Sequence, residues 1–199
     1  MKDDMKVNTY VELGFCMDKT IRNDLRQRLI SMLDRHSQIF VMMLTVRLPV
    51  AHADAECDLL FSGFLADFIR NERDCYGDVE FVWRFECGDA HTKDSGLAGH
   101  GQWRLVLYYN GDAHGSTSHR KHAERLWART LNLDTAADLI HVSEPKSAMS
   151  YRHEGFKLRR GDPELDKVRN DCFYWISYVA KFRPNIVAEK NKSYGCSQL

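Results

Sequence analysis

The chain has 199 residues, of which 44% are hydrophobic and 28% charged, a composition that fits one compact domain and argues against a disordered protein. Its six cysteines form no CxxC pair, which argues against a zinc ribbon and a disulfide framework and predicts reduced thiols. No basic start is followed by an apolar run, and no stretch approaches the length of a membrane span, so we expect a cytoplasmic protein that does not contact a membrane.

Charge is distributed unevenly along the chain although the formal net charge is zero. Residues 1–99 hold 12 Lys and Arg against 17 Asp and Glu, whereas residues 100–199 hold 16 against 11. Any phosphate-facing surface should therefore come from the second half. An accidental split over a solvated surface explains the same counts equally well.

Three elements are expected in the first part of the chain. Residues 19–36 place apolar side chains at helical spacing, with Asp18 as N-cap. Residues 38–50 are apolar and β-branched, which predicts a buried strand. Residues 57–77 predict a helix that stops at Gly77.

The second part of the chain predicts five further elements. Residues 78–86 and 102–110 read as two strands that pair antiparallel across a polar, glycine-bearing loop. Helix 118–131, strand 139–142 and helix 163–182 follow. The order predicts an α+β fold, an antiparallel sheet of βαββαβ (ferredoxin-like) plan with helices on one face and extra N- and C-terminal helices. No linker divides the chain, so we expect one compact unit. Residues 1–37 would form an N-terminal extension and helix, and residues 38–199 the main domain.

The last predicted helix carries a possible reactive group. Tyr174, Tyr178 and Lys181 fall on one side of it, and Tyr178 with Lys181 forms a YxxK pattern. A phenol has a free pKa of about 10 and needs a nearby cation or metal to act as a nucleophile, and Lys181 can supply part of that charge. An ordinary amphipathic helix with tyrosines on its wet face gives the same pattern.

Five segments in order resemble the YagK/YfjJ family, the inovirus-type replication proteins of phage and prophage DNA. The resemblance runs from about Gln38 to the C-terminus. The matching segments are LTVRLPV at 44–50, FVWRFE at 81–86, RLVLYYNGDAH at 104–114, FYWISYVAK at 173–181 and YGCSQ at 194–198.

This resemblance implies a Rep-like protein similar in plan to the HUH endonucleases. Such proteins initiate rolling-circle replication by attacking single-stranded or origin DNA with a tyrosine, here Tyr178 or Tyr174, beside a divalent metal held by a His-x-His pair. If the site is active, the resemblance implies a metal-dependent tyrosine DNA endonuclease with Mg²⁺ or Mn²⁺ as cofactor. The implied partners are DNA and host replication proteins. A catalytically degenerate, DNA-binding or regulatory prophage relative is the alternative, and a structural protein with no DNA role is a third.

The metal site is where this sequence departs from the family. The His-x-His pair falls on Gln102-Trp103-Arg104, and arginine cannot ligate a cation because it stays protonated. A shift of two residues gives His100 and Gln102 as ligands with Glu86 as a third, a set that suits Mg²⁺ or Mn²⁺. Arg104 can instead contact phosphate directly, or pair with Glu86 across the strands.

Several basic residues are candidates for DNA contact. Interleaved with Tyr151 and Phe156, the group suits single-stranded DNA, but an ordinary charged loop has the same composition. His119 and His122 are interpreted as a solvated helix start rather than a metal pair. The DNA-contact candidates are Arg47, Arg104, Arg152, Lys157, Arg159 and Arg160.

Overall fold

The computed structural model describes residue 5 and residues 16–49, 57–86, 101–111, 116–148, 150, 154–182 and 194–198. Within these ranges the helices are α1 (Lys19–Arg35), α2 (Cys57–Tyr76), α3 (Ser116–Leu131) and α4 (Leu165–Ile176), and a 3₁₀ turn, η4 (Ser177–Ala180), follows α4. The strands are β1 (Cys16–Met17), β2 (Gln38–Arg47), β3 (Val79–Glu86), β4 (Gln102–Asn110), β5 (Ile140–Val142), β6 (Phe156–Arg159), β7 (Lys181–Phe182) and β8 (Tyr194–Cys196).

One antiparallel sheet organises the molecule. Its strands lie in the order β5-β2-β4-β3-β8, with β6 also paired to β2, while β1 and β7 form a separate short pair. From β2 to β5 the chain runs strand, helix, strand, strand, helix, strand. The fold is therefore α+β with antiparallel sheets, as the sequence predicts.

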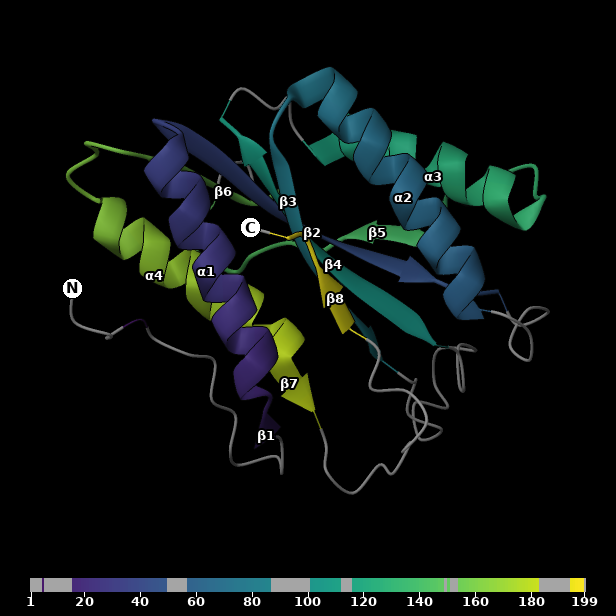
Figure 1. Ribbon diagram of the computed structural model, residues 1–199, viewed down its shortest axis with the longest axis horizontal. Helices are drawn as coiled ribbons and strands as arrows, with labels where there is room; N and C mark the ends of the chain where they lie inside the picture. The colour runs from purple at the N-terminus through teal and green to yellow at the C-terminus, as the bar shows by residue number, and fades with distance from the viewer. Residues whose placement is uncertain are drawn as a thin grey trace.

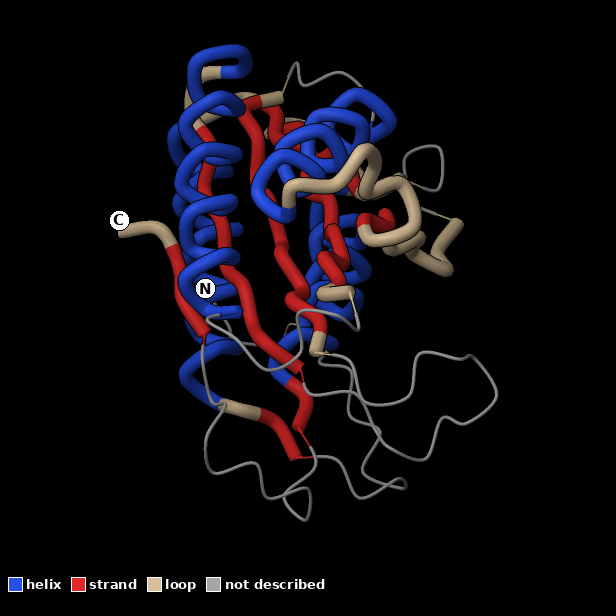
Figure 2. Tube along the Cα trace, turned by 90° about the vertical axis from the view of Figure 1, so that its right-hand side faces the viewer, coloured by secondary structure: helices blue, strands red, loops and turns tan. Residues whose placement is uncertain are grey.

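Helices cover both faces of the sheet. In Figure 1, α1 and α4 lie to the left of the sheet and α2 and α3 to the right, and Figure 2, turned by 90°, shows the long strands side by side. The α2/α3 side buries residues such as Phe40, Phe64 and Trp103, whereas the α1/α4 side buries Leu25 and Tyr108. The prediction of helices on one face holds for α2 and α3. The sequence analysis assigned no face to the two terminal helices, α1 and α4, which cover the other face.

Helix ends follow the local signals in the sequence. The Asp18 carboxylate accepts hydrogen bonds from the backbone amides of Thr20 and Ile21, 2.9 and 3.2 Å away, which caps α1. Gly77 has a φ of 78°, the left-handed conformation that ends α2 without a side-chain clash. Both predictions are confirmed.

The C-terminal helix differs from its prediction. A continuous helix over residues 163–182 is wrong, because α4 ends at Ile176, residues 177–180 form the 3₁₀ turn and Lys181 begins strand β7. The basic segment near residues 156–159, for which the sequence left a charged loop as an alternative, is strand β6. Within the described part of the chain, no helix has both the length and the hydrophobicity needed to cross a membrane.

The α1/α4 face changes from apolar to polar along the strands. The opposed residues Met43, Val106 and Val82 of β2, β4 and β3 are buried. Two residues further along each strand, on the same face, the side chains become polar. We call this region the polar sheet end, and it comprises Thr45, Arg47, Arg84, Glu86, Gln102, Arg104 and His141.

Candidate functional site

Tyr178 lies over the polar sheet end with two cations against its ring. The Arg104 Cζ atom is 4.7 Å from the centroid of the Tyr178 ring, and the Lys181 Nζ atom is 4.9 Å from the same centroid. The side chain of Tyr178 is 37% exposed, so this ring is held by the protein and still open to solvent. Two positive charges beside the exposed ring favour the binding of an anionic ligand at this position.

Glu86 holds Arg104 and Gln102 in place. Its Oε2 atom accepts hydrogen bonds from Arg104 Nε at 2.7 Å and from Gln102 Nε2 at 3.1 Å. Glu86 and Gln102 are directly opposed in the β3–β4 register, which explains the short reach. The predicted cross-strand ion pair between Arg104 and Glu86 is therefore present, and it fixes the guanidinium beneath the Tyr178 ring.

The backbone of the Tyr178 segment is fastened to the sheet by Arg84. Its Nη1 donates to the carbonyl oxygens of Val179 at 3.4 Å and Lys181 at 3.0 Å. The guanidinium also lies 5.6 Å from the centroid of the Phe182 ring. Burial lowers the pKa of Arg84 from its ordinary value, although Glu86 and Asp18 oppose this shift.

A second set of backbone bonds holds the same segment from the α1 side. The amide of Asp18 donates to the carbonyl of Ala180 at 2.8 Å, and Met17 pairs with Lys181 in the β1–β7 ladder. The Tyr178 turn is therefore anchored both to the start of α1 and to β3. This anchoring replaces the α-helical hydrogen bonds that the sequence analysis expected here.

Lys181 is placed beside the phenol by the 3₁₀ turn. In a 3₁₀ turn residues i and i+3 eclipse one another, so the pair comes together although the α-helix has already ended. The Lys181 side chain is largely buried, and this burial lowers the pKa of its ammonium group.

The alternative tyrosine, Tyr174, is on α4 one turn before the 3₁₀ segment. It is 40% exposed, and its carbonyl accepts a hydrogen bond from the Ser177 hydroxyl at 2.8 Å. The two cation contacts described above are made with the ring of Tyr178. The sequence pattern left open which tyrosine attacks, and we take Tyr178 as the candidate on these two contacts.

Of the three predicted metal ligands, Glu86 and Gln102 lie among the described residues, and the metal site as a whole stays a prediction. In these ranges no three His, Cys, Asp or Glu side chains converge as metal ligands. Glu86 already accepts from a permanently charged guanidinium, which opposes binding of a second cation, and Gln102 donates to the same carboxylate oxygen. His100, the third predicted ligand, lies outside the described residues.

A comparison with protein-family models matches the YagK/YfjJ C-terminal domain over residues 6–197. This chain belongs to that family. The match begins before the residue 38 boundary seen in the sequence and includes α1, whose apolar side packs on the sheet. Comparisons of this YagK/YfjJ family member with curated proteins and with solved structures found no match.

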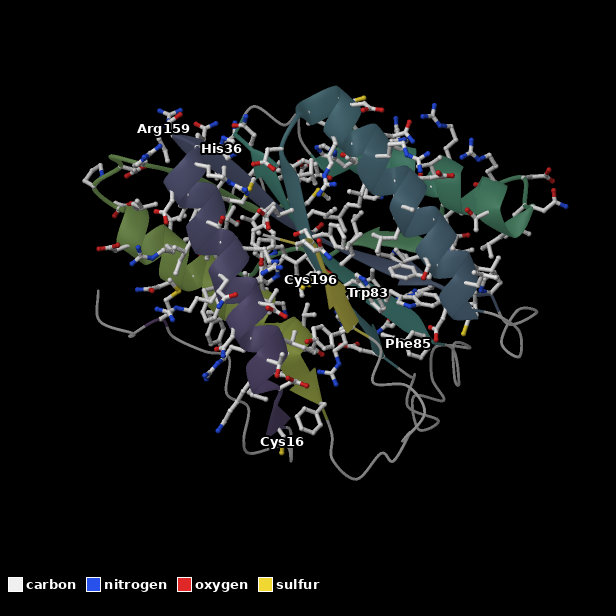
Figure 3. All side chains as sticks on the ribbon, viewed as in Figure 1. Cys16, His36, Trp83, Phe85, Arg159 and Cys196 are labelled. Atoms are coloured by element: carbon white, nitrogen blue, oxygen red, sulfur yellow. The ribbon has the colours of Figure 1, made fainter. Side chains whose placement is uncertain are left out.

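The other predicted DNA-contact residues are divided between two places. Arg47 belongs to the polar sheet end, opposite Gln102. Lys157 and Arg159 lie on β6, where Arg159 pairs with Gln38 of β2. Gln38 is seven residues before Thr45 of the polar sheet end, so the two positions are about 23 Å apart along β2. Figure 3 shows Arg159 near His36, far from Phe85, the neighbour of Glu86.

Arg160 follows β6 and is exposed at the same distant end, while Arg152 lies outside the described residues. The structure therefore brings Arg47 and Arg104 together with Tyr178 and Lys181. It does not bring Lys157, Arg159 or Arg160 to them.

A buried polar cluster was missed by the sequence analysis. Glu72 of α2 is fully buried and accepts from the Tyr109 hydroxyl at 2.9 Å, with His119 Nδ1 and His122 Nδ1 at 2.5 and 2.6 Å. The interpretation of both histidines as a solvated helix start is wrong, because His119 is fully buried and His122 joins it on one carboxylate.

The charge state of that cluster follows from its contacts. Burial raises the pKa of the Glu72 carboxyl, but hydrogen bonds from His119, His122 and Tyr109 outweigh burial and leave the pKa below its ordinary value. Burial and the adjacent carboxylate raise the pKa of Tyr109 well above its usual range. The cluster therefore holds a carboxylate between α2, α3 and β4, on the side of the sheet opposite Tyr178.

Proposed function

We propose that this protein is a Rep-like protein that binds single-stranded DNA at the polar sheet end and attacks one phosphodiester with Tyr178. The observation that carries the proposal is the accessible Tyr178 ring between Arg104 and Lys181. A phosphate placed at the phenol would lie against both cations, which neutralise its charge. The family membership and the strand-helix-strand-strand-helix-strand order support the same assignment.

The chemistry is a transesterification. The Tyr178 oxygen forms a bond to phosphorus while the bond from phosphorus to the 3′-oxygen breaks, which leaves a 5′-phosphotyrosine link and a free 3′-hydroxyl. The 3′-oxygen takes up a proton as it leaves, and the phenol proton passes to water or to Lys181. The lowered pKa of Lys181 favours this transfer, because more of its amine is neutral at a given pH, and the proton that it takes up makes it a cation beside the phosphate.

Arg104 has a positioning and charge-stabilising role. Its Nε is bound to Glu86, so the rest of the guanidinium is oriented for contact with an oxygen of the transferred phosphate. A fixed guanidinium at the position of a family histidine supplies positive charge without a metal. The role in phage or prophage replication follows from this activity, since the free 3′-hydroxyl is a primer for a polymerase.

A second function, a non-catalytic DNA-binding regulator, is favoured by one observation. The carboxylate best placed to hold a divalent cation, Glu86, is occupied by Arg104 and Gln102. With no cation at the scissile phosphate, the same cationic surface binds DNA without cleaving it.

One experiment separates these functions. Purified protein is mixed with single-stranded oligonucleotides of mixed sequence, with and without Mg²⁺ or Mn²⁺, and denaturing gels detect a covalent protein–DNA adduct. The proposal expects an adduct that Tyr178→Phe removes and Tyr194→Phe retains, because Tyr194 has the same 37% exposure and lies on β8.

Binding measured on the same samples decides the remaining cases. Salt-sensitive binding without an adduct supports the non-catalytic function. An adduct that persists in Tyr178→Phe and disappears in Tyr174→Phe reassigns the nucleophile. No binding at low salt removes the DNA-binding proposal altogether.

A further inference from the structure

Arg47 and His141 form an unusual pair on the far side of the polar sheet end. Arg47 Nη1 lies 3.1 Å from His141 Nε2, so a guanidinium contacts an imidazole rather than a carboxylate. His141 Nε2 also lies 2.9 Å from the backbone carbonyl oxygen of Asp138. Both side chains are half-buried on the same face of the sheet as Arg104.

The two contacts of His141 Nε2 require opposite states of that nitrogen. Arginine only donates hydrogen bonds, so Arg47 needs a lone pair on Nε2. The Asp138 carbonyl only accepts, so it needs a hydrogen on Nε2. One nitrogen cannot satisfy both partners, and the pair is therefore incomplete in the protein alone.

An anion between the two side chains removes this conflict. A phosphate oxygen accepts from Arg47 and from the Nδ1–H of a protonated His141, while Nε2–H stays on the Asp138 carbonyl. Both ring nitrogens carry a hydrogen only in the imidazolium, which the negative charge favours. Arg47 is held for this contact at its backbone, because its amide donates to Leu139 O at 2.8 Å and its carbonyl accepts from Trp127 Nε1 at 2.9 Å.

The position of the pair relates it to the proposed function. Thr45 lies directly between Arg104 and His141 in the sheet register, so His141 is two strand spacings, or about 10 Å, from Arg104. Consider a single strand of DNA whose scissile phosphate lies at Tyr178 and whose path crosses the β-strands of the sheet. It would bring a flanking phosphate to the Arg47–His141 pair. The Thr45 and Ser143 hydroxyls, 3.5 Å apart, border the same place.

The charged groups that face His141 are few among the described residues. From β2 the facing group is Arg47, and one strand further lies Arg104 with its partner Glu86. Helix α3 also packs against β5, but on the opposite face, where Ile140 is buried. The neighbouring Asp138 and Glu144 side chains are exposed.

We propose that Arg47 and His141 form a second phosphate subsite, which binds a backbone phosphate flanking the one at Tyr178 and takes up a proton on His141 as it does so. This inference rests on the proposed function, since it assigns the path of the same DNA strand. The proton comes from solvent, so binding tightens as pH falls through the range in which imidazoles become charged.

The test is the pH dependence of single-stranded DNA binding at constant ionic strength. We expect wild-type affinity to fall about tenfold between about pH 5.5 and 8, the ratio that one hydrogen bond to a charged group supplies. His141→Gln keeps an amide donor but cannot titrate, so its profile should be flat and should match the wild type at high pH. His36→Asn, which alters a histidine paired with Asp78 at the other end of the sheet, should keep the wild-type profile.

Further outcomes separate this inference from the proposed function. DNA binding with the same pH profile in wild type and His141→Gln overturns the subsite and leaves the function intact. If the protein binds no DNA, pyrophosphate is titrated while the imidazole signal of His141 is followed by NMR at about pH 6. A saturable shift that Arg47→Ala abolishes supports the subsite alone, and no shift overturns it.

Discussion

Glu86→Gln tests whether the carboxylate serves mainly to neutralise and orient Arg104. The substitution keeps the volume of the side chain and removes one negative charge from the polar sheet end, where Glu86 and Arg104 are 22% and 18% exposed. A phosphate at Tyr178 would lie roughly 7 Å from that carboxylate, and at an effective dielectric constant of ~60 the repulsion is ~0.8 kcal/mol. We therefore expect Glu86→Gln to bind single-stranded DNA about fourfold more tightly.

The assay is a fluorescence-anisotropy titration over a series of salt concentrations. Removing the carboxylate leaves Arg104 available for a further phosphate contact, so the slope of log K against log salt should steepen by about 0.7. Glu164→Gln is the matched control, because it makes the same charge change at the start of α4, at a side chain 58% exposed and about 20 Å of helix from Tyr178.

Weaker binding by Glu86→Gln, or an unchanged affinity and salt slope, would refute this reasoning. Weaker binding would show that DNA binding requires the carboxylate itself, either because its orientation of Arg104 outweighs its charge or because Glu86 holds a cation. Thermal unfolding of both variants is the check on folding, since loss of a half-buried ion pair costs at most about 1 kcal/mol.

Three further predictions concern the scaffold. Glu72→Ala leaves three donors without their carboxylate and should lower the free energy of unfolding by about 3 to 5 kcal/mol, measured by urea denaturation. Because the folded pKa of Glu72 is below its ordinary value of 4.5, its stabilisation is complete above that pH and lost as pH falls through the folded pKa. A pH series of the same denaturation should show this acid-side loss in wild type and a smaller one in Glu72→Ala. Gly195→Val should loosen β8 and speed amide exchange there, because a Cβ at Gly195 would lie 2.6 Å from Trp83 Nε1. Gly63→Ala is the control, because a Cβ there meets open space, and it should leave amide exchange in β8 unchanged.

Most of the long elements were predictable because their signals are local. The Asp18 cap and the Gly77 stop act within a few residues, β2 carries a nearly continuous apolar run, and β3 and β4 are rich in aromatic and β-branched residues. The alternation of β4 puts Gln102 and Arg104 on the face opposite the buried Trp103.

The missed features depend on partners that are distant in sequence. The turn at residues 177–180 is stabilised by Arg84 and by the amide of Asp18, neither of which the local pattern reveals. The donors to Glu72 lie 37, 47 and 50 residues away, so helical spacing around His119 could not identify them. Tyr178 and Lys181 came together nonetheless, because a spacing of three residues brings side chains together in both kinds of helix.

The opposition of Arg84 and Arg104 across β3 and β4 has a consequence for how the sequence can change. Two like charges at directly facing positions oppose folding, so this part of the sheet is less stable than an apolar pair would make it. Arg84 also fastens the turn at residues 177–180, so selection for heat resistance alone should replace Arg104 early and retain Arg84. The most thermostable variants from such a screen would be the ones least able to hold a polyanion.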